Sequence, residues 1–147
     1  MHETRCRVRY AETDQMGVVY YANYYVWMEI GRVELVRSLG IDYHTMEQTD
    51  GLLLSVVESH CRYIAPARYD QEIAICTEIT SSNSRLVEFQ YEIRNAESRH
   101  QLASGATKHM WLNREFRPTK LPGHYLKVME QAMSKEVQTP EAVPPRE

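Results

Sequence analysis

A helical pattern with apolar residues on two sides runs from Ala22 to Leu39, and it limits the folds open to this chain. Its main stripe repeats at spacings of three and four residues, and consists of Tyr24, Met28, Gly31, Leu35 and Leu39. A second apolar patch lies on another side, and consists of Val26, Ile30 and Val33. A helix of this kind buries more than one face, so we expect a sheet to wrap it. Gly31 in mid-helix costs about 1 kcal/mol relative to alanine, which a close approach of helix and sheet would offset.

After Leu52 the spacing of apolar residues changes to two, which predicts strands. The clearest alternation covers residues 86–94, where Val87, Phe89, Tyr91 and Ile93 share one face. Strands are predicted over residues 4–11, 52–63, 72–80, 86–94 and 102–113, and a short amphipathic helix near residues 125–132. Polar turns of hairpin length join the strands, so we expect antiparallel pairing. One central helix against one antiparallel sheet is an α+β fold.

Composition bounds the class of protein. The chain has 147 residues, of which 43% are hydrophobic and 25% charged, which predicts one folded domain over residues 1–134. The polar, proline-rich residues 135–147 are expected to be a disordered tail. A net charge of −3 argues against a nucleic-acid partner. We find no signal peptide and no apolar run long enough to cross a bilayer, so we expect a cytoplasmic protein without membrane insertion.

The spacing of the cysteines and histidines does not match a metal site. The three cysteines, Cys6, Cys61 and Cys76, form no C-x-x-C pair, and free thiols are expected. The six histidines show no metal-ligand spacing, so no metal is predicted.

The segment from Tyr10 to Tyr25 carries the residues best suited to chemistry. A strand-like run enters it, the long helical pattern leaves it, and Asp14 and Gly17 lie between them. The first N–H groups of a helix have no internal partner, and the helix dipole adds partial positive charge there. A carboxylate held beside such groups is sufficient for acyl chemistry on a good leaving group.

The run Asp14-Gln15-Met16-Gly17-Val18-Val19-Tyr20-Tyr21-Ala22-Asn23-Tyr24 resembles the active-site signature of the 4-hydroxybenzoyl-CoA thioesterase family. These proteins are hotdog-fold acyl-CoA thioesterases, and they include small bacterial enzymes linked to the Tol-Pal envelope system. The similarity continues through the helix and into residues 63–70, and in outline covers residues 5–113. It implies a hotdog fold, in which an antiparallel sheet wraps one long helix.

The resemblance also implies a reaction and a site. The reaction is hydrolysis of an acyl-CoA to free acid and CoA, with Asp14 as nucleophile or as general base and the backbone N–H of Tyr21 as oxyanion donor. The family site extends to acyl contacts from Gly17, Val18, Tyr24 and Ser59, and to CoA contacts from Ser84 and Arg85. No cofactor is implied, because the CoA thioester is the substrate. Little acid assistance is required when the thiolate departs, since a thiol has a pKa of about 8.5.

Exposed edges of long strands favour pairing between subunits, so we predict a homo-oligomer, a dimer or a homotetramer. Two other functions stay open. A hotdog dehydratase or hydratase would usually carry a histidine in the active-site segment, and none lies between Glu3 and Asp42. A non-catalytic acyl-CoA-binding or envelope-associated protein would bind without turnover. The acyl chain itself, aromatic or fatty, is left open.

Overall fold

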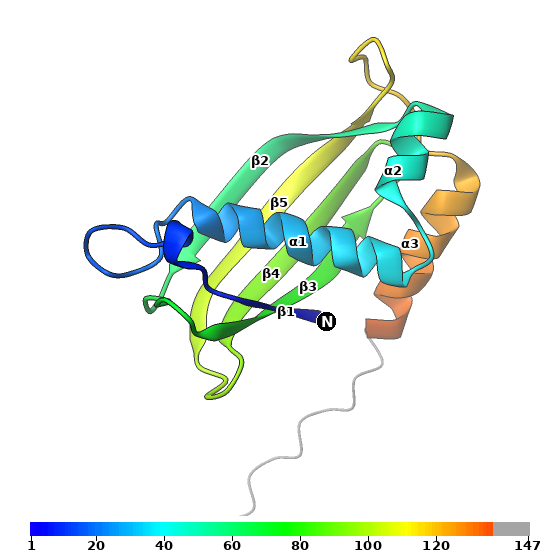
Figure 1. Cartoon of the computed structure of the whole chain (residues 1–147). Helices are drawn as coiled ribbons and strands as arrows, with labels where there is room; N and C mark the ends of the chain where they lie inside the picture. Colours follow the sequence, from blue (N-terminus) through cyan, green and yellow to red (C-terminus); the bar gives the residue numbers. More distant parts are fainter. Residues whose placement is uncertain (137–147) are drawn as a thin grey trace, which may run out of the picture.

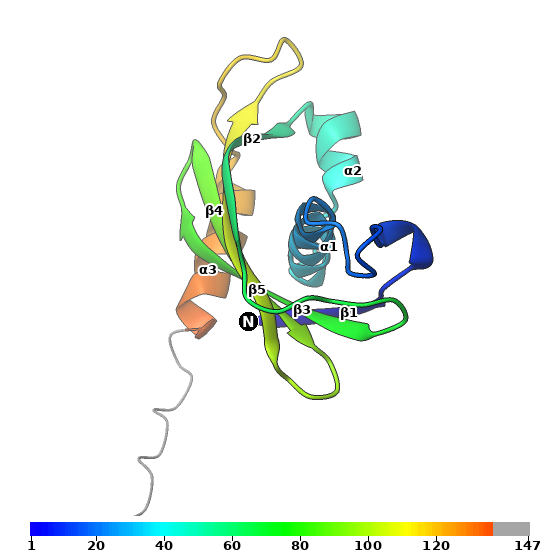
Figure 2. The ribbon, with the colours of Figure 1, turned by 90° about the vertical axis from the view of Figure 1, so that its left-hand side faces the viewer.

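The computed structural model of the chain describes residues 1–136. A five-stranded antiparallel sheet curves around one long helix, as Figures 1 and 2 show. The strands are β1 (His2–Arg7), β2 (Leu53–Tyr63), β3 (Glu72–Ser82), β4 (Leu86–Asn95) and β5 (Gln101–Leu112). The helices are the 3-10 turn η1 (Tyr10–Glu12), α1 (Asn23–Ser38), α2 (Tyr43–Thr45), the π-helical η2 (Met46–Asp50) and α3 (Gly123–Glu136). The predicted α+β class is confirmed.

The sheet separates two layers of helix. Helix α1 crosses the hollow face of the sheet, with α2 beside it near the start of β2, whereas α3 packs on the outer face (Figure 2). The strand order is β1-β3-β4-β5-β2, so β1 and β2 are the two edges. Along the strands, apolar residues of β3, β4 and β5 point into the layer that contains α1, and many of them are fully buried.

Gly31 marks the closest approach of α1 to the sheet. A Cβ built at this position would lie 2.3 Å from Thr77 Oγ1 and 2.7 Å from Ile75 Cγ2, both on β3. Side-chain atoms do not tolerate such distances, so any larger residue would push the helix away from the sheet. The helix–sheet contact that we expected to offset the mid-helix glycine is therefore present.

Two details of the predicted strands are wrong. The first strand ends at Arg7, because the chain turns into η1 over Tyr10–Glu12 where we predicted continued strand to Ala11. The strands β2 and β3 do not form a hairpin. They lie on opposite sides of the β4–β5 pair, and β2 pairs with β5 instead. Pairing of distant strands depends on tertiary packing, which local spacing does not report.

The structure tests only part of the expectation that residues 135–147 form a disordered tail. Helix α3 continues through Glu136, two residues into the segment expected to be a tail. The remainder of that prediction, residues 137–147, lies outside the described residues. Within the described part of the chain, no helix has the length and apolar character needed to span a membrane.

Candidate active site

Asp14 opens a tight turn between η1 and α1. The backbone N–H of Asp14 donates to the carbonyl of Val18 at 2.9 Å, and that of Gly17 donates to the carbonyl of Asp14 at 3.0 Å. The Asp14 carboxylate accepts a hydrogen bond from the Met16 N–H at 2.8 Å through Oδ1. Gly17 has φ +78°, a left-handed conformation that favours glycine, while a Cβ there would meet nothing within 4 Å. Gly17 is therefore required for the shape of the turn and not for space around it.

Glu12 fastens this turn to α1. Its side chain is 5% exposed and accepts hydrogen bonds from the Trp27 indole N–H at 3.0 Å and the Arg9 backbone N–H at 2.7 Å. Its carbonyl oxygen accepts from the Asn23 side-chain amide at 2.9 Å and from the Tyr20 N–H at 2.9 Å. A buried carboxylate with both oxygens occupied holds its partners firmly, because a lost partner would leave a desolvated polar group. The position of Asp14 relative to α1 thus depends on Glu12.

The residues just before α1 offer free donors. Neither Tyr21 nor Ala22 donates its backbone N–H to an acceptor in the part of the chain that the structure describes. The carbonyl of Tyr21, in contrast, accepts a hydrogen bond from the Tyr63 hydroxyl at 3.0 Å, which ties the helix start to β2. Such N–H groups at a helix N-terminus attract negative charge. They meet the chemical requirement for an oxyanion donor.

Asp14 and Tyr21 border one cavity of about 320 Å³, defined here as the Asp14 cavity. Its other lining residues are Met16, Val18, Val19, Tyr24, Tyr63, Ile64, Ala65 and Pro66. Tyr24 is 3% exposed, and its hydroxyl accepts the Ala67 N–H at 3.3 Å, so the apolar ring remains for the cavity. Burial raises the pKa of Tyr24, which keeps this hydroxyl protonated. Apolar walls with few polar groups are typical of a small-molecule site.

Four of the predicted site residues therefore meet at the Asp14 cavity: Asp14, Val18, Tyr21 and Tyr24. Gly17 shapes the adjoining turn without lining it. Ser59 is exposed on β2, two and four residues from Cys61 and Tyr63, so it shares their face of the strand but does not line the cavity.

Ser84 and Arg85 lie at the other end of the sheet. They precede β4, whose first residue Leu86 pairs with Met110 of β5, whereas Tyr63 beside the cavity pairs with Ala103. Met110 lies seven residues after Ala103, which is roughly 23 Å along the strand. Within one chain, this turn does not reach the Asp14 cavity.

Sequence reasoning missed the wall of the cavity that β2 and the following loop provide. Tyr63, Ile64 and Pro66 lie about fifty residues after Asp14, and alternation alone does not show which strand end faces the helix start. The family resemblance had included residues 63–70, and that was the available signal. Glu12 was also missed, although an acidic residue two positions before Asp14 was visible in the sequence.

Among the described residues, no group of histidine, cysteine and acidic side chains is placed to hold a metal ion. The lining of the Asp14 cavity within that part of the chain contains no histidine.

Comparison with known proteins places this geometry in a family. The family model for the thioesterase-like superfamily matches residues 8–142. The putative acyl-CoA thioesterase YneP of Bacillus subtilis is 46% identical over 88 residues, which are 60% of this chain and 63% of that protein. The acyl-CoA thioester hydrolase YbgC of Escherichia coli is 37% identical over 95 residues, 63% of this chain and 68% of that protein. In YneP the match spans a little under two thirds of the protein's length.

A solved structure extends the likeness over most of the fold. The DHNA-CoA thioesterase of Staphylococcus aureus superposes with a TM-score of 0.82 at 29% identity, covering 92% of this chain and 89% of that one. Together with the family match, this likeness identifies the wrapped sheet as a hotdog fold. The chain belongs to the thioesterase-like superfamily.

Proposed function

We propose that this chain is an acyl-CoA thioesterase, similar to the 4-hydroxybenzoyl-CoA thioesterases, which hydrolyses an acyl-CoA to a free acid and CoA. One observation carries the proposal: Asp14 and Tyr21, whose N–H is free, border the same apolar cavity at the start of α1. The names of the relatives support it, since YneP, YbgC and the Staphylococcus aureus protein are all described as acting on CoA thioesters.

The chemistry needs two contributions from the protein. In one route water adds to the thioester carbonyl with Asp14 as general base. In the other, Asp14 displaces CoA as thiolate and forms a mixed anhydride, which water then opens. In both routes the C–S bond breaks, the sulfur leaves with its electron pair, and the acid and CoA are released. The free oxygen of Asp14 suits either role, because Met16 occupies only Oδ1.

The second contribution is stabilisation of the oxyanion that forms on the carbonyl carbon. In the proposal the Tyr21 N–H donates to this oxygen, with the dipole of α1 behind it. A single donor of this type lowers a barrier by about 3 kcal/mol. Val18 and Tyr24 would then hold the acyl group against the apolar wall of the cavity.

We propose further that the working unit is a homo-oligomer. The edge strand β2 pairs with β5 on one side only, and it exposes Val56 and Val57 in its middle. The opposite edge, β1, is short and carries Arg5 and Arg7 in ion pairs, which discourages edge pairing. A second copy on β2 would also explain how Ser84 and Arg85 serve CoA, since they lie far from Asp14 of their own chain. A single domain to about residue 134 and a cytoplasmic location complete the proposal.

Thiol release from a panel of short, long and aromatic acyl-CoAs tests the reaction. Asp14→Asn keeps the shape of the side chain but removes the charge, so kcat should fall about 1,000-fold or more. The control is Asp70→Asn, the same change in an exposed turn with φ +68°, which asparagine tolerates. It should retain wild-type rates. Saturable acyl-CoA binding without thiol release, or equal rates for both variants, would favour a non-catalytic binding protein.

A single turnover in H₂¹⁸O tests whether Asp14 forms a mixed anhydride that water opens at the Asp14 carboxyl carbon. A mixed anhydride that water opens at Asp14 leaves the label in the Asp14 carboxylate, and a general base puts the label into the product acid. Mass spectrometry of the peptide containing Asp14 reads out the first outcome.

A further inference from the structure

Tyr63 ends β2 and stands against the start of α1. Its hydroxyl donates to the Tyr21 carbonyl at 3.0 Å. Its ring makes perpendicular contacts with two neighbouring rings: the centroids are 6.3 Å apart for Tyr21 and 5.1 Å apart for Tyr24, each at an interplanar angle of 88°. Such edge-to-face contacts are favourable for aromatic rings and hold Tyr63 in one orientation. The hydroxyl is therefore directed at one carbonyl oxygen.

The stability of the fold is not sufficient reason for this hydroxyl. Tyr63 is 45% exposed, so its hydrogen bond mostly replaces hydrogen bonds to water and its net contribution to stability is small. A phenylalanine would present the same apolar ring to the Asp14 cavity. Partial burial and the neighbouring Cys61 thiol raise the pKa of Tyr63, so the hydroxyl stays protonated and remains a donor.

The hydrogen bond from Tyr63 acts on the peptide group between Tyr21 and Ala22. The carbonyl oxygen of this peptide accepts from two donors, the Tyr63 hydroxyl and the Tyr24 N–H at 3.3 Å. The N–H of the same peptide belongs to Ala22, and it donates to no acceptor within residues 1–136. Hydrogen bonds to a carbonyl polarise the amide, which makes its N–H a stronger donor. Tyr63 therefore strengthens the Ala22 N–H.

The N–H groups of Tyr21 and Ala22 are consecutive and face the same end of the helix. The chain already winds in a helical turn here, because the three N–H groups of residues 23–25 each donate to the carbonyl three residues earlier, at 3.0 to 3.3 Å. Ala22 itself has φ −67° and ψ −23°, which are helical values. N–H groups that precede such a turn point out of its N-terminal end. Two donors thus face the side of α1 on which Asp14 lies.

We propose that Tyr63 is a positioning residue for a second oxyanion donor, the N–H of Ala22, which acts beside the N–H of Tyr21. The inference rests on the proposed thioesterase function, in which the oxyanion forms next to Asp14. The ring of Tyr63 lines the Asp14 cavity, whereas its hydroxyl acts through the peptide behind the donor. A donor whose interaction strengthens as negative charge develops lowers the barrier without tightening substrate binding. The effect of Tyr63 should therefore appear in kcat and not in KM.

Tyr63→Phe removes the hydroxyl and keeps the ring with its contacts. Thiol release should show a kcat about tenfold lower, with KM within about twofold of the wild type. The matched control is Tyr125→Phe, which also loses a hydroxyl hydrogen bond, to Asp50 at 2.5 Å, near the opposite end of β2. It should leave both constants unchanged. An unchanged kcat in Tyr63→Phe, or an equal fall in both variants, would overturn the proposal.

Ala22→Pro removes the proposed donor itself. Proline fixes φ near −65°, and Ala22 already has φ −67°. The N–H that is lost has no acceptor within residues 1–136, so no hydrogen bond of that part of the fold is broken. The kcat should fall about 100-fold, which is typical for one oxyanion donor. Ala22→Ser changes the side chain but keeps the N–H, and it should retain the wild-type kcat.

The double variant separates positioning from a merely structural role. If Tyr63 acts through the Ala22 N–H, Tyr63→Phe should lower kcat about tenfold in the wild-type background and by no more than about twofold in Ala22→Pro. The full tenfold loss in both backgrounds would show that Tyr63 acts independently of this N–H, which contradicts the proposal.

Site-specific replacement of Tyr63 by 3-fluorotyrosine tests the same point without the proline variant. Fluorine makes the phenol more acidic and thus a stronger hydrogen-bond donor, so kcat should rise about twofold above the wild type. A merely structural role predicts an equal or lower kcat, and that result would count against the proposal. If the wild type hydrolyses no acyl-CoA of the panel, the proposed function fails. If the wild type and Tyr63→Phe hydrolyse one equally fast, only this inference fails.

Discussion

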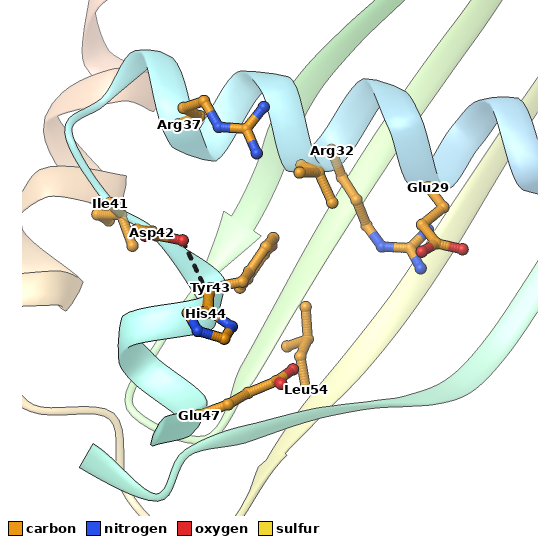
Figure 3. A pocket seen from close by; sticks show the side chains of 10 residues that line it. Glu29, Arg32, Arg37, Ile41, Asp42, Tyr43, His44, Glu47 and Leu54 are labelled. Atoms are coloured by element: carbon orange, nitrogen blue, oxygen red, sulfur yellow. Dashed lines mark hydrogen bonds between the residues drawn. The ribbon is translucent and has the colours of Figure 1, made fainter. Parts of the chain in front are cut away.

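The two cavities along α1 are nearly equal in volume, at about 320 and 330 Å³, yet they differ in chemistry. The Asp14 cavity lies at the helix start and is apolar, with one carboxylate and free backbone N–H groups at its border. The second cavity, lined in part by Glu29, Arg32, Val33 and Leu54 and called the Arg32 cavity, lies beside the middle of the helix (Figure 3). Every backbone N–H there is already used within the helix. Charge there comes from side chains instead. Position along a helix, more than cavity size, therefore decides which groups are available to a ligand.

One buried polar side chain lies next to each cavity. The side chain next to the Asp14 cavity is a carboxylate, and the one next to the Arg32 cavity is a neutral imidazole. Glu12 holds the Asp14 turn through two N–H donors, Trp27 and Arg9. His109 stands behind Arg32 as a neutral imidazole that both donates and accepts. The first arrangement requires two acceptor oxygens, and the second requires one donor and one acceptor. Substitutions that change only this hydrogen-bonding capacity test the difference.

The largest effect is expected for acid titration of His109. Burial, together with the nearby Arg32 charge, lowers the pKa of His109 to about 4 from the ordinary 6.5. The unfolded chain then binds the proton more readily, so this stability is present above pH 6.5 and is lost as the pH falls toward 4. The loss at pH 4 should be about 3 kcal/mol. Urea unfolding at pH 7 and pH 4 measures it.

His109→Gln removes the titrating group, so it should lose about 3 kcal/mol less between the two pH values than the wild type. The control is His100→Gln, which makes the same change at an exposed position. Equal pH sensitivity of the wild type and His109→Gln would show that His109 titrates normally.

An intermediate effect is expected at Glu12. Glu12→Gln replaces one acceptor oxygen by an N–H₂ donor, so either the Trp27 indole or the Arg9 backbone N–H loses its partner in a buried place. Unfolding free energy should fall by about 2 kcal/mol. The thiol-release kcat, measured well below the unfolding midpoint, should fall about tenfold, because Asp14 is no longer fixed against α1. Glu97→Gln, the same change at an exposed position, should change neither quantity. A wild-type kcat in Glu12→Gln would show that catalysis does not depend on the hydrogen bonds of Glu12.

The smallest effect is a difference in stability between two variants, each of which loses one tyrosine hydroxyl beside one of the two cavities. Tyr24→Phe leaves the Ala67 N–H without its acceptor and should destabilise the fold by about 1 kcal/mol. Tyr43→Phe removes a hydroxyl that has no hydrogen-bond partner among residues 1–136, so stability should stay the same or rise slightly. Thermal unfolding of the two variants side by side provides the measurement. Equal losses would mean that Tyr43 has a partner in the native protein.

Much of the fold was predictable because its signals are local. The apolar stripe of α1, the alternation of β4 and the mid-helix glycine each report a contact with a neighbouring layer. The strand partner of β2 was not predictable, since several strand orders satisfy the same alternation. The turn at Tyr10–Glu12 was missed for a related reason. Glu12 points inward only because Trp27 of α1 is there to meet it.

For the candidate site, the sequence alone determined the segment: the turn of Asp14 and Gly17, and the helix that follows with its free N–H groups. These features depend on residues close together in the chain, which fix backbone conformation directly. Tertiary structure alone decided what stands opposite them. The wall from Tyr63 to Pro66, the support from Glu12, and the cavity around Arg32 all join residues that are distant in sequence. Packing selects such neighbours by shape and burial of the whole chain, and no local pattern records that choice.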